Sequence, residues 1–264
     1  MTEVKKVKIP RERASFPAVV IAFLLFSIVF FLSTVGARQE KAVLSHTTEA
    51  GFSSREIALE DMRCYLIALS GGGEAENARI DSARYMKRGA AGYLMERNGQ
   101  WFSIGNMYFS KEEADLITEH LLKNGINASV IELNEKGVTL RVTADEDTLD
   151  ALSFCVSAFR EYEESLMNFS YRLDAGELSK REARVLLSVL YYDLSEKRAE
   201  AEKALKTLDK NAAKEIFAMY LNLLDDVSSL TKNEGGEMML SARIKYALID
   251  HALLKISLLK YARA

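Results

Sequence analysis

The fold of this chain is decided by a stretch of sequence that occurs twice, about 36 residues apart. The first copy reads CYLIALSGGGEAENARIDSARYMKRG (residues 64–89), and the second reads WFSIGNMYFSKEEADLITEHLLKNG (residues 101–125). Each copy opens with an apolar run, continues with a helical pattern and ends at Gly89 or Gly125, and a further apolar run follows it, the last reaching Leu133. This order predicts a β-α-β-β-α-β fold, in which two helices cover one face of a small sheet and leave the other face free.

The alternation of side chains along a strand predicts which residues face the two helices. If Ser70 is aligned with Gly105, four apolar side chains point toward the helices: Ile67, Leu69, Phe102 and Ile104. Six others then point to the open face: Leu66, Ala68, Tyr93, Met95, Trp101 and Ser103. Helical spacing predicts the inner faces of the helices as Ala78, Ser82, Tyr85 and Met86 in the first, and Ala114, Ile117, Leu121 and Leu122 in the second.

The order and duplication of these motifs resemble the SPOR (sporulation-related repeat) domain. The pattern of that family is an aromatic and apolar strand, a Gly turn, a helix that opens with Glu-x-Ala, and a Gly. The same series of elements then occurs a second time. The resemblance covers about 70 of the 264 residues. It implies a bacterial cell-envelope domain that binds peptidoglycan glycan strands stripped of stem peptides, in proteins with one membrane helix that act in cell division or sporulation. The sequence departs from the pattern at Ala68, where Gln is usual, and at residues 71–73, where a turn aromatic is frequent.

The predicted open face carries candidates for glycan contacts. The apolar C–H faces of a sugar pack on aromatic rings, and polar side chains orient its hydroxyls. Trp101 is the leading candidate, although a tryptophan at a strand start also commonly packs against a neighbouring element. Ala68 offers no side-chain hydrogen bond, so the second turn is expected to supply polar or aromatic contacts. The complete set is Trp101, Tyr93, Ser103, Ala68, Asn106 and Tyr108.

An uncharged segment near the N-terminus predicts a membrane anchor. Residues 14–37 contain no charge, and residues 16–32 are almost wholly apolar. Roughly 20 such residues at about 1.5 Å each span a hydrocarbon core of about 30 Å. The basic tail, residues 1–15, places the N-terminus in the cytoplasm and the main body outside the membrane. A cleaved signal peptide ending near Ala37 is an alternative, but the apolar run exceeds the usual core of such peptides.

Composition and charge favour a folded protein that does not bind nucleic acid. Of the residues, 48% are apolar and 28% are charged, as in globular domains. The net charge is −3 overall, but residues 1–15 carry +3, so the rest of the chain is acidic. Binding to phosphates requires clustered Lys and Arg, and the acidic body has no basic stripe.

The predicted fold class is therefore α+β, in five segments: a cytoplasmic tail (1–15), a transmembrane helix (16–36), a juxtamembrane linker (37–61), a ferredoxin-like SPOR-type domain (62–144) and an antiparallel helical bundle (145–264). Residues 138–142 alternate like one more strand that extends the sheet. The helical part is expected to contain four helices, over residues 147–173, 179–205, 209–231 and 237–263.

The sequence gives little support for catalysis, metals or cofactors. His46, His120 and His251 are far apart in the predicted elements, and no nucleophile motif or phosphate loop accompanies them. Cys64 and Cys155 are predicted to be buried small residues rather than a disulfide. We therefore expect a protein that is not an enzyme and has no cofactor or metal.

Two functional hypotheses follow. In the first, the SPOR-like sheet face binds glycan strands while the helical domain engages another envelope protein. In the second, the chain is an envelope scaffold whose sheet face is covered by the helical domain or by a partner and no longer binds glycan. The position of the helices relative to Tyr93 and Trp101 distinguishes them.

Overall fold

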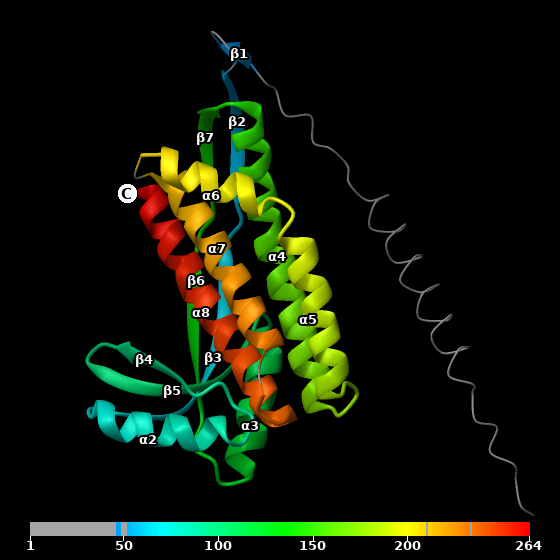
Figure 1. Ribbon diagram of the computed structural model, residues 1–264. Helices are drawn as coiled ribbons and strands as arrows, with labels where there is room; N and C mark the ends of the chain where they lie inside the picture. Colours follow the sequence, from blue (N-terminus) through cyan, green and yellow to red (C-terminus); the bar gives the residue numbers. More distant parts are fainter. Residues whose placement is uncertain (1–45, 49–51, 210, 233) are drawn as a thin grey trace, which may run out of the picture. The chain divides into compact units, whose positions relative to one another are not determined.

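In the computed structural model, the repeated segment forms one antiparallel four-stranded sheet with two helices (Figure 1). The structure describes residues 46–48, 52–209, 211–232 and 234–264. The elements follow the predicted order: β3 (Met62–Gly72), α2 (Ala75–Met86), β4 (Tyr93–Arg97), β5 (Gln100–Tyr108), α3 (Lys111–Lys123) and β6 (Ser129–Glu135). The strands lie in the order β4-β5-β3-β6. The first strand of the repeat, β3, is therefore the neighbour of its last strand, β6.

The duplication is visible in how the two helices end. Gly89 and Gly125 have φ of +88° and +74°, a left-handed conformation that glycine adopts at little cost. The N–H of the following residue then reaches back in the same way in each copy: Ala90 N donates to Tyr85 O, and Ile126 N donates to Leu121 O. The two glycines therefore terminate equivalent helices and direct the chain into β4 and β6.

The pairing of β3 with β5 corrects the predicted side-chain orientations. Ala68 pairs with Ile104 and Ser70 pairs with Ser103, so the register shifts at Leu69 and again at Gly105. Because such a shift turns the following side chains to the opposite face, Ile104 and Phe102 point away from α2 and α3, contrary to prediction. A Cβ on Gly105 would lie 2.5 Å from Leu69 Cδ1, so this close approach requires glycine.

The helix faces largely follow the predicted spacing. Ala78 and Ser82 of α2 are buried, and so is Ala114 of α3. Leu122, predicted to face inward, is instead half exposed, and Thr118 takes the inner position one turn after Ala114.

A second, three-stranded sheet lies outside the repeat. Its strands are β1 (His46–Thr48), β2 (Phe52–Leu59) and β7 (Val138–Ala144), in the order β1-β2-β7. Residues 52–59 were expected in the linker, and residues 138–142 were expected to extend the first sheet; instead the two segments pair with each other. The long-range pairing of β2 with β7 supplies the hydrogen bonds that each segment lacks alone.

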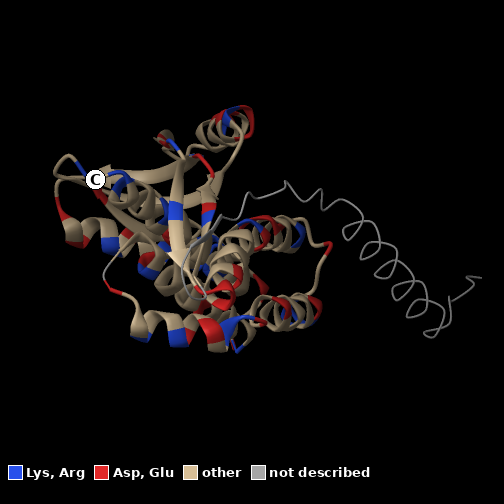
Figure 2. Ribbon diagram, turned by 90° about the horizontal axis from the view of Figure 1, so that it is seen from above, with Lys and Arg blue, Asp and Glu red and all other residues tan. Residues whose placement is uncertain are grey.

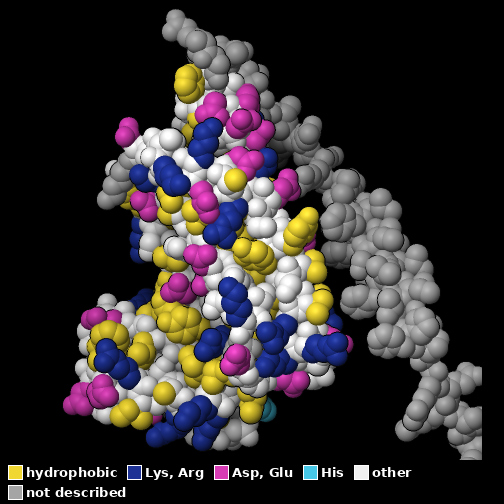
Figure 3. Space-filling view, viewed as in Figure 1, with side chains coloured by type: hydrophobic (Ala, Val, Ile, Leu, Met, Phe, Trp, Pro, Cys, Tyr) yellow, Lys and Arg dark blue, Asp and Glu magenta, His cyan; other side chains and the backbone are white. Residues whose placement is uncertain are grey.

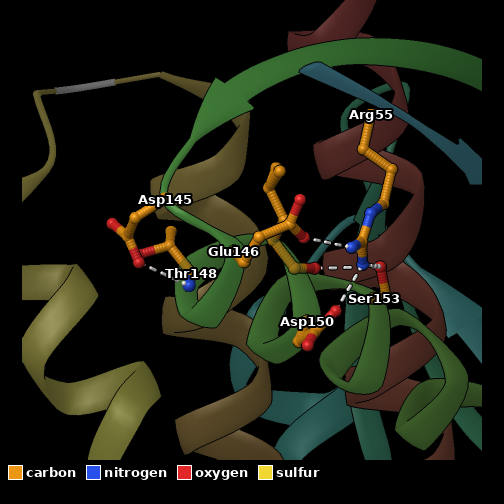
Figure 4. Close-up of polar contacts among 7 residues, drawn as sticks. Arg55, Asp145, Glu146, Thr148, Asp150 and Ser153 are labelled. Atoms are coloured by element: carbon orange, nitrogen blue, oxygen red, sulfur yellow. Dashed lines mark hydrogen bonds and ion pairs between the residues drawn. The ribbon is translucent and has the colours of Figure 1, made fainter. Parts of the chain in front are cut away.

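Arg55 links β2 by ion pairs to the first long helix, α4 (Glu146–Asp174) (Figure 4). Its guanidinium lies 2.7 Å from Glu146 Oε2 and 2.6 Å from Asp150 Oδ1. Asp145 caps the same helix, because its side chain accepts a hydrogen bond from Thr148 N. The strand that follows the N-terminal region is thus tied into the folded body.

The remaining residues are helical, as predicted, with one difference. The helices after α4 are α5 (Lys180–Leu194), α6 (Arg198–Thr207), α7 (Ala212–Thr231) and α8 (Glu237–Arg263). The predicted helix over residues 179–205 is broken between α5 and α6, where a turn bonds Arg198 N to Ser195 O. Viewed from above, acidic and basic residues are interspersed along the outer helices (Figure 2).

Helix α8 covers the sheet face that was predicted to be open. It packs on β3 and β5 on one side and on α4 and α7 on the other. Leu66, Ala68 and Ile104 of the sheet thereby join one continuous apolar core with Phe159 of α4 and Leu248 of α8. The sheet and the helices belong to one compact unit, residues 45–264.

The predicted tail, transmembrane helix and first part of the linker lie outside the described residues. Among the helices that the structure describes, none is both long enough and apolar enough to cross a membrane.

Candidate functional site

The six candidate residues fall into three separate places. Tyr93 and Ala68 lie under α8, Trp101 and Ser103 lie on the opposite face of the sheet, and Asn106 and Tyr108 line a cleft beside α3. The continuous binding surface that the sequence predicts is therefore not formed.

Tyr93 is engaged by α8 rather than free for a ligand. Its hydroxyl donates a hydrogen bond to Asp250 Oδ1 at 2.9 Å, and its ring lies 4.7 Å from the ring of Tyr246, centroid to centroid. Burial, followed by the hydrogen bond to Asp250, raises the pKa of Tyr93 above its ordinary value, so the phenol stays protonated. Its neighbours Leu66 and Ala68 are almost fully buried. Helix α8 therefore covers this part of the sheet.

Trp101 points the other way. It pairs with Gly72 and Glu96 and shares its face with Ser103 and Gly105, whose Cβ position is directed at Leu69 on the α2 side. Trp101 is half-buried near the β4–β5 turn, and Ser103 is fully buried. Neither residue shares a surface with Tyr93.

Asn106 and Tyr108 lie in a cleft of about 480 Å³. The shift at Gly105 turns Asn106 to the same face as Ile67, and into the cleft. The apolar part of the wall comes from four elements, β3, α3, α4 and α8, and includes Ile67, Leu69, Ile117, Leu121, Leu173 and Met238.

An ion pair between a buried lysine and an exposed aspartate lies at one side of this cleft. Lys245 Nζ is 2.7 Å from Asp174 Oδ2 and donates to Gly89 O, also at 2.7 Å. Ser241 Oγ donates to the second oxygen, Asp174 Oδ1, at 2.6 Å. Three segments, the α2–β4 loop, the end of α4 and the start of α8, are joined by one lysine.

The amide of Asn106 is held in a fixed orientation. Its Oδ1 accepts a hydrogen bond from Met107 N, and its Nδ2 donates to the Tyr108 hydroxyl, each at 2.9 Å. Burial raises the pKa of Tyr108, so its hydroxyl remains a neutral donor. The pair therefore presents N–H and O–H donors to the cleft.

A second polar cluster lies deep between α4 and α8. Lys255 Nζ donates to Glu163 Oε1 at 2.9 Å, and His251 Nε2 lies 3.2 Å from the same oxygen. Burial alone would raise the pKa of Glu163, but contacts with His251 and Lys255 outweigh it and lower the pKa; burial lowers the pKa of His251. All three side chains are buried away from solvent, which favours a structural role.

The described residues include neither a metal-ligand cluster nor an activated thiol. Within the described ranges, no group of three His, Cys, Asp or Glu side chains is placed to hold a metal ion. Cys64 and Cys155 are free and buried. Burial raises the pKa of the Cys64 thiol to about 12, so it is not a poised nucleophile.

Comparison of the chain with models of known families, with curated proteins and with solved structures found no match. Function must therefore be inferred from the geometry of the site.

Sequence reasoning found Asn106 and Tyr108 but missed the residues that complete the cleft. Gly89 and Lys245 are 156 positions apart, and Asp174 comes from a third element. None of them belongs to a local motif, so only the packing of α8 against the repeat brings them together.

Proposed function

We propose that this chain is a membrane-anchored envelope protein that serves as an interaction scaffold, with a SPOR-like domain held against its own helical domain. In this proposal a single helix over residues 16–36 anchors the chain, its N-terminus is cytoplasmic and its folded body is extracytoplasmic. The body binds protein partners in division or sporulation, and it neither catalyses a reaction nor binds glycan on its sheet.

The observation that carries this proposal is the docking of α8 on the sheet. Tyr93, one of the aromatic candidates for sugar contacts, is bonded to Asp250 and packed on Tyr246, whereas the leading candidate, Trp101, lies on the opposite face. To expose that face, α8 would have to leave a core that also includes Leu66 and Ile104, both fully buried. Burial of such side chains stabilises a fold by about 1.5–3 kcal/mol each, so exposure is costly.

The helical domain offers a surface for a partner. Val185, Val189 and Tyr192 recur at helical spacing on α5, and each is more than half exposed. Hydrophobic side chains gather over α4 and α5 in the space-filling view (Figure 3). An apolar ridge at this spacing is typical of helices that pack against another protein.

Co-sedimentation with isolated peptidoglycan tests the sheet part of the proposal. The region 45–264, which forms one compact unit, should stay in the supernatant with intact and with stem-peptide-free peptidoglycan. If it pellets, and either Tyr93→Ala or Trp101→Ala abolishes pelleting, glycan binds the sheet and the scaffold proposal is wrong.

Localisation of a full-length fluorescent fusion tests the interaction part. The double substitution Val189→Ser, Tyr192→Ala removes most of the α5 ridge without touching the core, and it should disperse a localised signal. Trp101→Ala is the matched control and should leave localisation unchanged. Unaltered localisation of the α5 variant would show that α5 does not bind the partner.

A further inference from the structure

The cleft beside α3 has the size and walls of a site for a small organic group. Its volume of about 480 Å³ falls within the usual range of roughly 300–1,000 Å³ for ligand sites. Ile117 and Leu121 of α3 face Leu173 and Met238 across it, so one part of any occupant must be apolar.

The charges around the cleft are balanced. Asp174 is paired with Lys245, and the two other charged residues in the lining, Arg88 and Glu237, have opposite signs. A charged ligand would enter a site with no net compensating charge and would lose hydration. The lining therefore favours a neutral ligand.

The cleft keeps three free hydrogen-bond donors. Each Asp174 oxygen already accepts one bond, from Lys245 or Ser241, and the amide oxygen of Asn106 accepts one from Met107 N. An ammonium has three N–H groups and an amide has two, so Lys245 and Asn106 each retain one, and Tyr108 retains its O–H. Such donors match carbonyl oxygens.

We propose that this cleft binds a short peptide segment of a partner, taking backbone carbonyl oxygens on Tyr108, Asn106 and Lys245 and an apolar side chain between α3 and the start of α8. The identification of the occupant as a partner's peptide rests on the proposed interaction role. Binding of the peptide unit itself does not depend on that role and is measured separately.

Four small probes discriminate the chemistry in a ligand-observed NMR titration of the full chain. N-acetyl-leucine amide is neutral and carries two carbonyls and an apolar side chain; N-acetyl-leucine adds a negative charge, leucinamide adds a positive charge, and N-acetylglucosamine presents an acetamide on a sugar. At about 0.3 kcal/mol for each of its non-hydrogen atoms, N-acetyl-leucine amide should bind with a Kd on the order of 1 mM. The two charged probes and the sugar should bind at least about five-fold more weakly.

Two conservative substitutions place the binding in the cleft. Tyr108→Phe removes one donor and should weaken N-acetyl-leucine amide about five-fold, as expected for loss of one hydrogen bond. Ile117→Ala shortens the apolar wall and should weaken it by a similar factor. Leu116→Ala is the matched control, because Leu116 is the adjacent residue on α3 and is 66% exposed. Thermal unfolding without probe confirms that each variant is folded.

Several outcomes would overturn the inference. Absence of binding by N-acetyl-leucine amide, or equal loss in Leu116→Ala, excludes a peptide site in the cleft. Preferred binding of N-acetyl-leucine identifies an anion site, and preferred binding of N-acetylglucosamine identifies a sugar site. None of these results alters the proposal about the sheet face, which the co-sedimentation experiment tests alone.

Discussion

The two faces of the four-stranded sheet are covered by different parts of the chain. On one face, Tyr65, Ile67 and Leu69 pack with Ala114 and the loop residue Ala128 in a small separate cluster. On the other face, Leu66, Ala68 and Ile104 join a core that continues through α4, α7 and α8. The first cover comes from within the repeat, whereas the second comes from a helix more than 100 residues later in the chain. A repeat that predicts one complete face therefore does not predict that the other is free.

Replacing one leucine on each face with alanine should give the largest effects on stability. The two losses show which covered face contributes more to the free energy of unfolding. Leu66→Ala opens a cavity in the continuous core and should lower the free energy of unfolding by about 4 kcal/mol. Leu69→Ala, in the smaller cluster, should cost about 2 kcal/mol because its surroundings can relax more easily. Urea unfolding followed by circular dichroism measures both. Equal losses would contradict the difference between the faces.

The core behind α8 also contains a buried ion pair, which the other face lacks among its described residues. Lys255→Met leaves the Glu163 carboxylate without its cation and should cost about 3 kcal/mol. The double variant Glu163→Gln, Lys255→Met removes both charges and should recover most of that loss. A double variant as unstable as Lys255→Met alone would show that packing, and not charge compensation, dominates at this position.

One tyrosine hydroxyl on each face allows the energies of single hydrogen bonds to be compared. Tyr93 donates to the Asp250 carboxylate, whereas Tyr85 donates to the Leu69 carbonyl at 3.2 Å on the α2 side. Hydrogen bonds to charged groups are the stronger class, so Tyr93→Phe should cost about 1.5 kcal/mol and Tyr85→Phe about 0.5 kcal/mol. Chemical denaturation at neutral pH resolves the two values. A smaller loss for Tyr93→Phe would indicate that α8 is held by apolar packing alone.

Local patterns in the sequence were sufficient for the parts of the fold that local physics controls. Gly89 and Gly125 end helices because each must adopt positive φ, and the spacing of Ala78, Ser82 and Ala114 follows the helical period. Asn106 and Tyr108 were expected in a turn but lie inside β5, and the register shift at Gly105 decides which way Asn106 points.

Features that depend on pairing or on distant segments were not predictable in this way. The shifts at Leu69 and Gly105 reversed the expected orientation of Ile104, because nothing in either strand alone sets their register. The break between α5 and α6 falls at Ser195 without a Gly or Pro to mark it. Apolar and charged residues are mixed around helix α8, so its sequence marks no single face for burial and does not indicate what the helix packs against.

The last predicted effect is a pH dependence of stability at the contact between α7 and α8. Burial, and then the negative charge of nearby Asp250, raises the pKa of Asp226 on α7 to about 6. Its pKa in the unfolded chain is the lower, ordinary value of 3.8, so the folded state binds the extra proton between about pH 4 and pH 6. The contribution of Asp226 to stability is therefore full below the unfolded pKa and is lost as the pH rises through about 6.

Asp226→Asn removes this titration and should therefore remove its contribution to the pH dependence of stability. Relative to the unsubstituted protein, the variant should gain stability as the pH rises from 4 to 7, by about 1 kcal/mol once screening at this half-buried position is allowed for. Asp225→Asn, at the exposed neighbouring position on the same helix, is the matched control and should show no such trend. Urea unfolding at pH 4, 5, 6 and 7 gives the profile. A difference between Asp226→Asn and the unsubstituted protein that stays constant with pH would contradict the raised pKa of Asp226.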